Sequence, residues 1–421
     1  MKTLFLAFLI LFCSNVCMSK DIIGIKNHYR AGLPSFFSKL RAGETVNIAY
    51  LGGSITEAKN GWRDQSMKWL QETYPKTMIT QINAGIGGTG SDLGVFRLKK
   101  DVLVHKPDLI FVEFAVNDNN LAPKIIRQTM EGIVRQIWRD DKQIDICFVY
   151  TLTGNTAETL MKGKVTNAIQ AMDDIAEHYK IPSIHLGIEV LQLFKEKKLV
   201  FRGLPEEFPD KIVFSKDNTH PYEQTGHKLY TDVLKKALKE MASLKREPFK
   251  RDLAPYEADN WEDAQMITLE EVTKEGEWEV VAPNDKKINN FFLKKFPFLL
   301  RGTKANSSAI TFDFEGTLVG LYDIVGPGCG QIAIYIDNKL VTTKARFDKY
   351  STYYRPQYFY LPGIEKGKHR AKFLLSGLTL DKASILKEGG RTIEDYHPYH
   401  DNFCYLGYLL IRGNKIHEIS P

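Results

Sequence analysis

The sequence predicts two folded units in tandem, a three-layer α/β sandwich followed by an all-β sandwich. Between Val46 and about Ser243, short apolar runs alternate with amphipathic stretches, which is the pattern of a parallel sheet covered on both faces. After Lys245 the pattern changes to two-residue periodicity rich in aromatic residues, with glycine and proline between the runs. The 421-residue length fits two domains, and 43% hydrophobic with 26% charged residues is an ordinary globular composition.

Five runs are candidate strands of the first unit, because they are rich in Val, Ile and Phe and nearly continuous in hydrophobicity. They are Val46–Leu51, Met78–Asn83, Leu109–Phe114, Ile144–Thr151 and Ile181–Leu186. Apolar residues at helical spacing predict helices over Trp62–Thr73, Leu93–Val104, Pro123–Arg139, Ala157–Tyr179 and Tyr222–Leu244. Right-handed crossovers between parallel strands then give the three-layer sandwich.

The second unit has the pattern of an antiparallel β-sandwich, with a jelly roll as the expected variant. Candidate strands are Ala309–Phe314, Gln331–Ile336, Tyr358–Leu361 and Ala371–Leu375. Turns are predicted at Asp337-Asn338 and at Gly326-Pro-Gly328. The charged stretch from Lys245 to Arg251 is interpreted as a linker, so that the two domains are expected over residues 20–245 and 246–421.

Residues 1–19 have the pattern of a secretory signal peptide. Lys2 gives a short positive start, Leu4–Cys13 is an unbroken apolar run, and small or polar residues follow. We therefore expect an exported protein, periplasmic or secreted. Cys17 leaves a lipid anchor as an alternative, although Val16 is bulkier than such a site favours. Because no later apolar run approaches 18 residues, no transmembrane segment is expected.

Composition also restricts the expected partners and cofactors. The net charge is +6, but Lys and Arg are spread along the chain, which argues against nucleic acid as a partner. Neither a CxxC nor an HExxH pattern occurs, so no metal site and no cofactor are expected. Cys147, Cys329 and Cys404, the cysteines beyond the leader, form at most one disulfide. The oligomeric state is left open.

Two glycine-containing motifs follow the first two predicted strands. Leu51-Gly-Gly-Ser-Ile-Thr56 exposes Ser54 at the carboxyl edge of the sheet, where open α/β sheets bind ligands. Asn83-Ala-Gly-Ile-Gly-Gly-Thr-Gly90 satisfies GxGxxG and suggests a dinucleotide site. We set that alternative aside because the motif follows the second strand instead of the first, and an exported protein meets little NAD. The glycines still allow the backbone to approach a ligand closely.

Two further motifs supply an amide, a carboxylate and an imidazole. Phe114-Ala-Val-Asn-Asp118 ends the third strand and places Asn117 at the same sheet edge as Ser54. Asp217-Asn-Thr-His-Pro221 precedes the last helix, and an Asp and a His three residues apart on one turn can pair. The carboxylate can then hold one imidazole tautomer. Either motif alone is also compatible with an ordinary surface turn.

Taken together, the four motifs, in the order Ser, Gly, Asn and Asp-His, resemble the four sequence blocks of the SGNH, or GDSL-type, hydrolase superfamily. The resemblance implies a flavodoxin-like sandwich with strand order 2-1-3-4-5 and a serine hydrolase. It implies that Ser54 is the nucleophile, His220 the general base and Asp217 the acid that orients it. It further implies an oxyanion hole formed by the Ser54 N–H, the Gly88 N–H and the Asn117 side-chain amide.

The sequence departs from this family at two positions. Gly53 stands where an Asp is usual, and Ala115 stands where the third block often has Gly. Neither position supplies an essential proton in the family mechanism. The α/β-hydrolase alternative fits less well, because its nucleophile turn needs GxSxG and Thr56 stands where the last Gly belongs.

The leader, the second domain and the resemblance together favour an exported O-acetylesterase acting on a carbohydrate or polysaccharide fragment. Arg63, Asp118 and Tyr396 are the candidate substrate-binding residues, and the aromatic runs 353–360 and 396–399 are candidates for stacking on sugar rings. Two alternatives stay open. One is a glycan O-acetyltransferase of the same fold, and the other is a non-catalytic glycan-binding protein.

Overall fold

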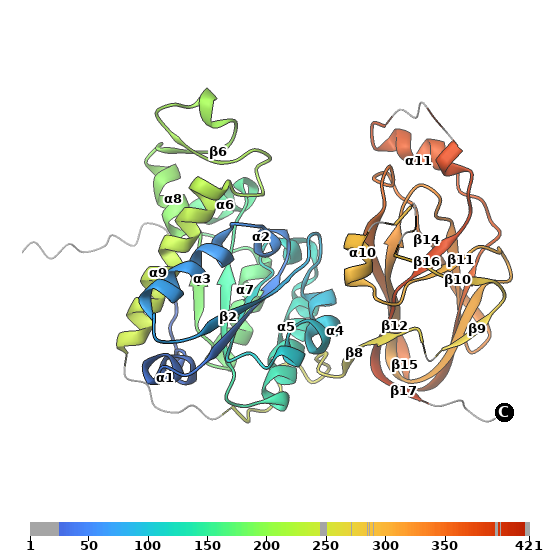
Figure 1. Ribbon diagram of the computed structural model, residues 1–421, viewed down its shortest axis with the longest axis horizontal. Coiled ribbons are helices and arrows are strands. Elements are labelled where there is room, and N and C mark those ends of the chain that lie inside the picture. The colour runs from blue at the N-terminus through green and yellow to red at the C-terminus, as the bar shows by residue number, and fades with distance from the viewer. Residues whose placement is uncertain are drawn as a thin grey trace, which may run out of the picture.

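The computed structural model describes residues 25–416 except 245–250, 271, 284, 286, 289, 392–394 and 396. The predicted leader and most of the predicted linker lie outside the described residues. The chain forms an N-terminal α/β unit and a C-terminal β unit, which lie side by side in Figure 1. Within the described ranges, no helix has the length and apolar character needed to cross a membrane.

A five-stranded parallel sheet forms the centre of the N-terminal unit, with strand order β2-β1-β3-β4-β5. The strands are β1 Val46–Gly52, β2 Ile79–Gly85, β3 Leu109–Glu113, β4 Asp145–Tyr150 and β5 Ser183–His185. Strands β3, β4 and β5 are buried along their whole length, which explains their continuous hydrophobicity. The predicted three-layer fold with order 2-1-3-4-5 is confirmed.

Helices pack on both faces of this sheet (Figure 1). They are α1 Pro34–Ala42, α2 Ser54–Glu57, α3 Trp62–Thr73, α4 Ser91–Asp101, α5 Pro123–Asp140, α6 Gly154–Met161, α7 Asn167–His178, α8 Ile188–Lys195 and α9 Lys228–Ser243. The single helix predicted over Ala157–Tyr179 is two helices. The chain turns at Gly163, whose φ is +71°, and the Thr166 side chain then caps α7 by accepting the Ile169 N–H. The sequence prediction also missed a small parallel pair, β6 Leu199–Arg202 and β7 Ile212–Ser215.

The C-terminal unit consists of antiparallel sheets, as predicted. The larger sheet has the order β14-β13-β15-β12-β17-β8, with β9 also pairing with β12, and the smaller has the order β10-β11-β16. The strands are β8 Ala264–Thr268, β9 Thr273–Glu275, β10 Trp278–Val280, β11 Leu300–Gly302, β12 Ala309–Val325, β13 Gln331–Ile336, β14 Lys339–Ala345, β15 Arg355–Leu375, β16 Cys404–Leu406 and β17 Tyr408–Ile416. Two short helices, α10 Asn290–Lys295 and α11 Lys382–Glu388, interrupt them.

The strands of the larger sheet are longer than the sequence pattern predicts. The runs Tyr358–Leu361 and Ala371–Leu375 belong to the single strand β15, which pairs with β12 on both sides of a register shift between Gly316 and Leu318. The predicted turn at Asp337-Asn338 joins β13 to β14, with both residues at positive φ.

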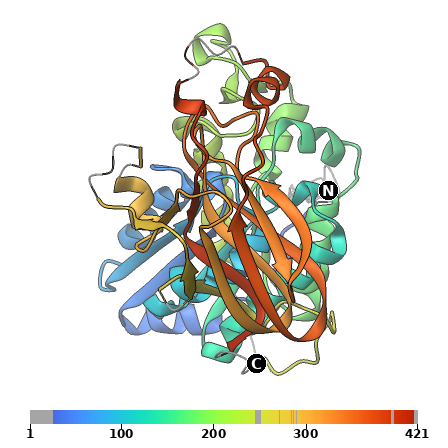
Figure 2. The same cartoon turned by 90° about the vertical axis from the view of Figure 1, so that its right-hand side faces the viewer.

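The segment that precedes β8, residues 251–263, packs on the N-terminal unit, and we call it the strap. The Trp261 N–H donates to the Gln128 carbonyl of α5 at 3.0 Å, and the Trp261 ring lies 5.7 Å from that of Phe96. The buried Glu131 carboxylate, also on α5, accepts two backbone N–H groups of the strap. One continuous apolar cluster therefore extends from the parallel sheet through Trp261 into the C-terminal unit. Figure 2 shows the β unit in front of the α/β unit.

Candidate active site

Ser54, His220 and Asp217 form a line of hydrogen bonds at the carboxyl end of the parallel sheet. Ser54 Oγ lies 2.9 Å from His220 Nε2, and His220 Nδ1 lies 2.6 Å from Asp217 Oδ2. Ser54 begins α2 directly after β1, whereas the other two residues lie in the loop between β7 and α9. The fold thus brings together an alcohol, an imidazole and a carboxylate from distant parts of the sequence, with spacing suited to proton transfer.

Hydrogen bonds within the turn orient the Asp217 carboxylate. Oδ1 accepts the N–H groups of Thr219 and His220 at 3.0 and 2.8 Å, which leaves Oδ2 for the imidazole. Asn218 stands at φ +73°, a conformation that Asn adopts more readily than most residues. Partial burial opposes ionisation, but the hydrogen bonds from His220 and Thr219 outweigh it and lower the pKa of Asp217 to about 2. The ionised carboxylate favours the tautomer with the proton on Nδ1, so that Nε2 is free to accept from Ser54.

The three predicted oxyanion donors lie on segments that border Ser54. The Asn117 side chain lies over Gly53, where a Cβ would be 2.1 Å from Asn117 Oδ1. A side chain at position 53 would therefore require the Asn117 side chain to move. On the other side, a Cβ on Gly87 would be 3.6 Å from Ser54 Cβ, and the exposed Gly88 that follows has a φ of +71°.

Buried carboxyl groups lie behind these loops. Glu113, at the end of β3, accepts the hydroxyl groups of Thr56 and Thr151 at 2.9 and 2.5 Å, and burial raises its pKa. Asp118 accepts the Ser91 N–H at 2.9 Å. Burial, together with the nearby Asp92 carboxylate, raises the pKa of Asp118 to about 8. Both residues therefore support the segments on which Ser54 and Asn117 lie.

Two of the three predicted substrate-binding residues are buried. Arg63 is 4% exposed, and its guanidinium donates to the carbonyl groups of Thr56 and Ala58 while pairing with Asp64. Asp118 has no exposed surface. Neither side chain is presented to a substrate, because each is used within the N-terminal unit. The third residue, Tyr396, lies outside the described residues.

The C-terminal unit contacts the site region at two places that the sequence did not reveal. The hydroxyl groups of Tyr358 and Tyr360 donate to the Asp92 carboxylate at 2.7 and 3.1 Å. Lys295 of α10 pairs with Glu57, the last residue of α2, at 3.0 Å. The two tyrosines come from the aromatic run considered for sugar stacking, and they hold a buried carboxylate between the units instead.

In the part of the chain that the structure describes, no three His, Cys, Asp or Glu side chains are grouped so that they could hold a metal ion. The chemistry that the described residues offer is that of a serine nucleophile with a histidine base.

The motifs that carry these residues match a known protein family. Residues 50–225 match the model of the GDSL-like Lipase/Acylhydrolase family, a span that contains Ser54, Gly88, Asn117, Asp217 and His220. The whole chain is similar to two crystal structures of a two-domain esterase active on acetylated mannans, one of them co-crystallised with mannopentaose. Both structures are 21% identical in sequence to this chain. The complex with mannopentaose aligns with a TM-score of 0.68 over 93% of this chain, and the other structure aligns with a TM-score of 0.72 over 94%. Each alignment covers 98% of the esterase chain. This likeness shows that the two-domain fold is shared. No match to the sequence was found among curated proteins.

Proposed function

We propose that the chain is a carboxylic ester hydrolase that removes O-acetyl groups from a carbohydrate, because residues 50–225 match the model of the GDSL-like lipase/acylhydrolase family. The hydrogen-bonded line of Ser54, His220 and Asp217 carries this proposal. The substrate class is supported by the two-domain fold that the chain shares with an esterase active on acetylated mannans.

In the proposed reaction Ser54 is the nucleophile. His220 Nε2 takes the hydroxyl proton as Ser54 Oγ attacks the acetyl carbonyl carbon, and it then gives the proton to the sugar oxygen as the ester C–O bond breaks. A water molecule attacks the acetyl-Ser54 ester with His220 again as the base, which releases acetate and restores Ser54. Asp217 stays ionised and stabilises the imidazolium that forms in each step.

The negative charge on the acetyl oxygen is stabilised by the Ser54 N–H, the Gly88 N–H and the Asn117 side-chain amide. Donors placed where an oxyanion develops contribute about 10²–10³ each in rate. The His220 and Asp217 side chains are both 53% exposed, so the reacting groups lie at the surface. An acetyl group on a polysaccharide chain therefore reaches Ser54 without the polymer entering a deep cavity.

The test compares the wild-type protein with the Ser54→Ala variant on an aryl acetate. We expect the wild type to release the aryl alcohol and the variant to lose the activity, and equal rates would refute the assignment of the nucleophile. Acetate release from a panel of acetylated polysaccharides, including mannan and xylan, then tests the substrate class. Release from aryl acetate but from none of the polysaccharides would overturn the carbohydrate proposal while leaving the esterase intact.

Two further parts of the proposal need their own measurements. Hydrolysis is separated from acetyl transfer by following acetyl groups to water and to an added sugar acceptor, and we expect acetate as the main product. Export rests on the leader pattern of residues 1–19. It is tested by sequencing the N-terminus of the protein recovered outside the cytoplasm.

A further inference from the structure

We propose that Glu57 is a positioning residue for ester cleavage, and that Lys295 of the C-terminal unit holds it in place. Glu57 ties the glycine-rich segment 85–90, which we call the oxyanion loop, to the helix that carries the nucleophile. The proposal rests on the function proposed above, because it concerns the orientation of the Gly88 N–H as an oxyanion donor. It goes beyond the family motifs, because Glu57 and Lys295 lie in none of the four sequence blocks quoted above.

Glu57 connects three parts of the molecule. It ends the four-residue helix α2, which Ser54 begins, and its N–H donates to the Gly53 carbonyl at 2.9 Å. Its Oε2 accepts the Gly87 N–H at 2.7 Å, and its Oε1 accepts from Lys295 Nζ at 3.0 Å. Each carboxylate oxygen thus has its own partner, one in the oxyanion loop and one in the C-terminal unit.

The oxyanion loop needs such a tether because of its composition. Glycines at positions 85, 87 and 88 give its backbone more conformational freedom than any other residue type allows. The bond to the Gly87 N–H fixes the peptide plane between Ile86 and Gly87. The Gly88 N–H lies in the next peptide plane, so this bond limits the directions in which the Gly88 N–H can point. Since Glu57 and Ser54 share one turn of helix, the nucleophile and this donor keep a fixed relation to each other.

The loop is also packed directly against the Glu57 backbone. A Cβ on Gly85 would lie 2.4 Å from the Glu57 N and 2.6 Å from its Cα, so the two segments are in closest contact where a side chain is absent. A Cβ on Gly87 would lie 3.0 Å from Glu57 Oε2. Position and hydrogen bond therefore agree in placing the loop relative to α2.

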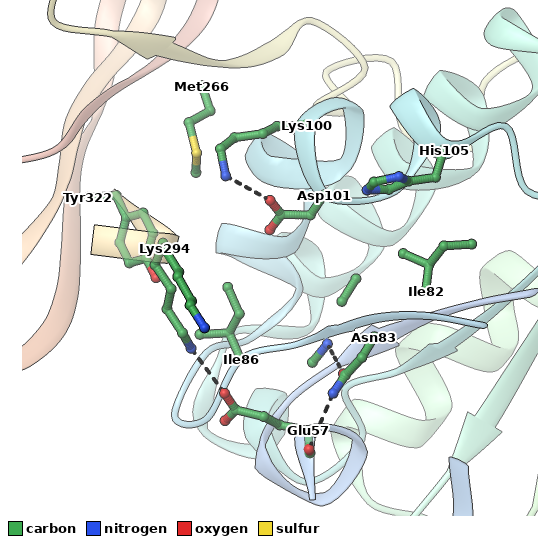
Figure 3. A pocket seen from close by; sticks show the side chains of 13 residues that line it. Glu57, Ile82, Asn83, Ile86, Lys100, Asp101, His105, Met266, Lys294 and Tyr322 are labelled. Atoms are coloured by element: carbon green, nitrogen blue, oxygen red, sulfur yellow. Dashed lines mark hydrogen bonds and ion pairs between the residues drawn. The ribbon is translucent and has the colours of Figure 1, made fainter. Parts of the chain in front are cut away.

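Lys295 connects the Glu57 carboxylate to the C-terminal unit. Exposed ion pairs contribute little, but the Lys295 side chain is only 18% exposed and that of Glu57 is 32% exposed. A pocket of about 370 Å³ lies between the units. Figure 3 shows Glu57 at this pocket, where Ile86 of the oxyanion loop faces Tyr322 and Lys294 of the C-terminal unit. The ion pair crosses the interface here, so the position of α10 is transmitted to the carboxylate that holds the loop.

The experiment measures kcat and KM for an aryl acetate in four variants. Full loss of an oxyanion donor lowers kcat by about 10²–10³, so we expect a loosened donor in Glu57→Ala to lower kcat by about 10–100-fold with KM nearly unchanged. Glu57→Gln keeps an oxygen that can accept the Gly87 N–H, so it should recover most of that loss. Lys295→Met should lower kcat by about threefold to tenfold, since the carboxylate remains but loses its charged partner.

Lys294→Met is the matched control, because Lys294 is the neighbouring lysine of α10 and the described residues provide it with no ion pair. We expect wild-type kinetics for this variant.

A purely structural role for Glu57 predicts a lowered thermal midpoint with unchanged kcat, or equal losses in Glu57→Ala and Glu57→Gln, and either result would overturn the proposal. Active wild type, inactive Ser54→Ala and unaltered Glu57→Ala would refute the positioning role while leaving the esterase function standing. Equal rates for wild type and Ser54→Ala would instead refute the esterase function itself.

Discussion

The two halves of the candidate active site are built in different ways. The half proposed to move protons, Asp217 with His220, is one short turn that is held by its own backbone N–H groups and is half-exposed. The half proposed to stabilise charge lies on loops supported by buried carboxyl groups and by a second unit far along the chain. Local hydrogen bonds are enough to orient a base, whereas donors on a glycine-rich loop need the tertiary fold to hold them.

The strongest test of the local half is Asp217→Asn. The amide no longer favours the Nδ1–H tautomer, so we expect kcat for an aryl acetate to fall by about 10⁴. Because the side chain is exposed, the free energy of unfolding should change little, which urea titration followed by circular dichroism can check. A loss in activity below about tenfold would show that the turn is not what orients His220.

On the charge-stabilising half, Asn117→Ala removes one proposed donor. We expect kcat to fall by about 10²–10³ while KM stays within a small factor, because the amide acts mainly in the transition state. Steady-state kinetics on the same aryl acetate measures both parameters. A raised KM at constant kcat would instead assign Asn117 to ground-state binding.

The contribution of the second unit is tested by replacing Tyr358 and Tyr360 with Phe. The buried Asp92 then loses two hydroxyl donors, and we expect each replacement to lower the free energy of unfolding by about 1–3 kcal/mol. Tyr353→Phe is the control, since Tyr353 lies on the same run but is 57% exposed. Equal stability of all three variants in urea would show that the tyrosine–carboxylate contact does not hold the units together.

We expect Asp118→Asn to have the smallest effect on activity. Its main effect should be on how the free energy of unfolding depends on pH. Burial raises the pKa of Asp118 from 3.8 to about 8, so the folded protein binds more protons than the unfolded chain between these values. The free energy of unfolding should therefore fall as pH rises from about 4 to about 8. Asparagine is neutral throughout, so the variant should show a weaker decline in urea titrations at pH 5, 7 and 9. An unchanged slope would show that Asp118 is ionised in the folded state.

The sequence predicts the local half of the site better than the distant half. Asp217 and His220 are three positions apart, and that spacing alone suggests their pairing. Glu57 and Asp92 look like ordinary charged residues, and their partners in the C-terminal unit lie 238 and 266 positions away. No local pattern marks such pairs.

Burial accounts for the other differences. Arg63 was a candidate substrate-binding residue because it closely follows the Ser54 loop in sequence, but it is buried, and carbonyl groups and a carboxylate compensate its burial. The alternating strands and helices of the first unit gave its fold class, and the resemblance to a known family gave its strand order. The break at Gly163 inside a predicted helix could have been read from the sequence, since glycine followed by a threonine cap often separates two helices.

The strap restricts where the chain can be divided into two fragments. Trp261 and its neighbours belong by sequence to the later half of the chain, yet they cover α5 and Phe96 of the earlier half. A gene fragment that stops at the helix end near Ser243 would encode a hydrolase with a bare apolar flank. A recombinant that exchanges only the β-sandwich must therefore keep residues 251–263 of the original hydrolase. This requirement makes the two units difficult to exchange between unrelated genes.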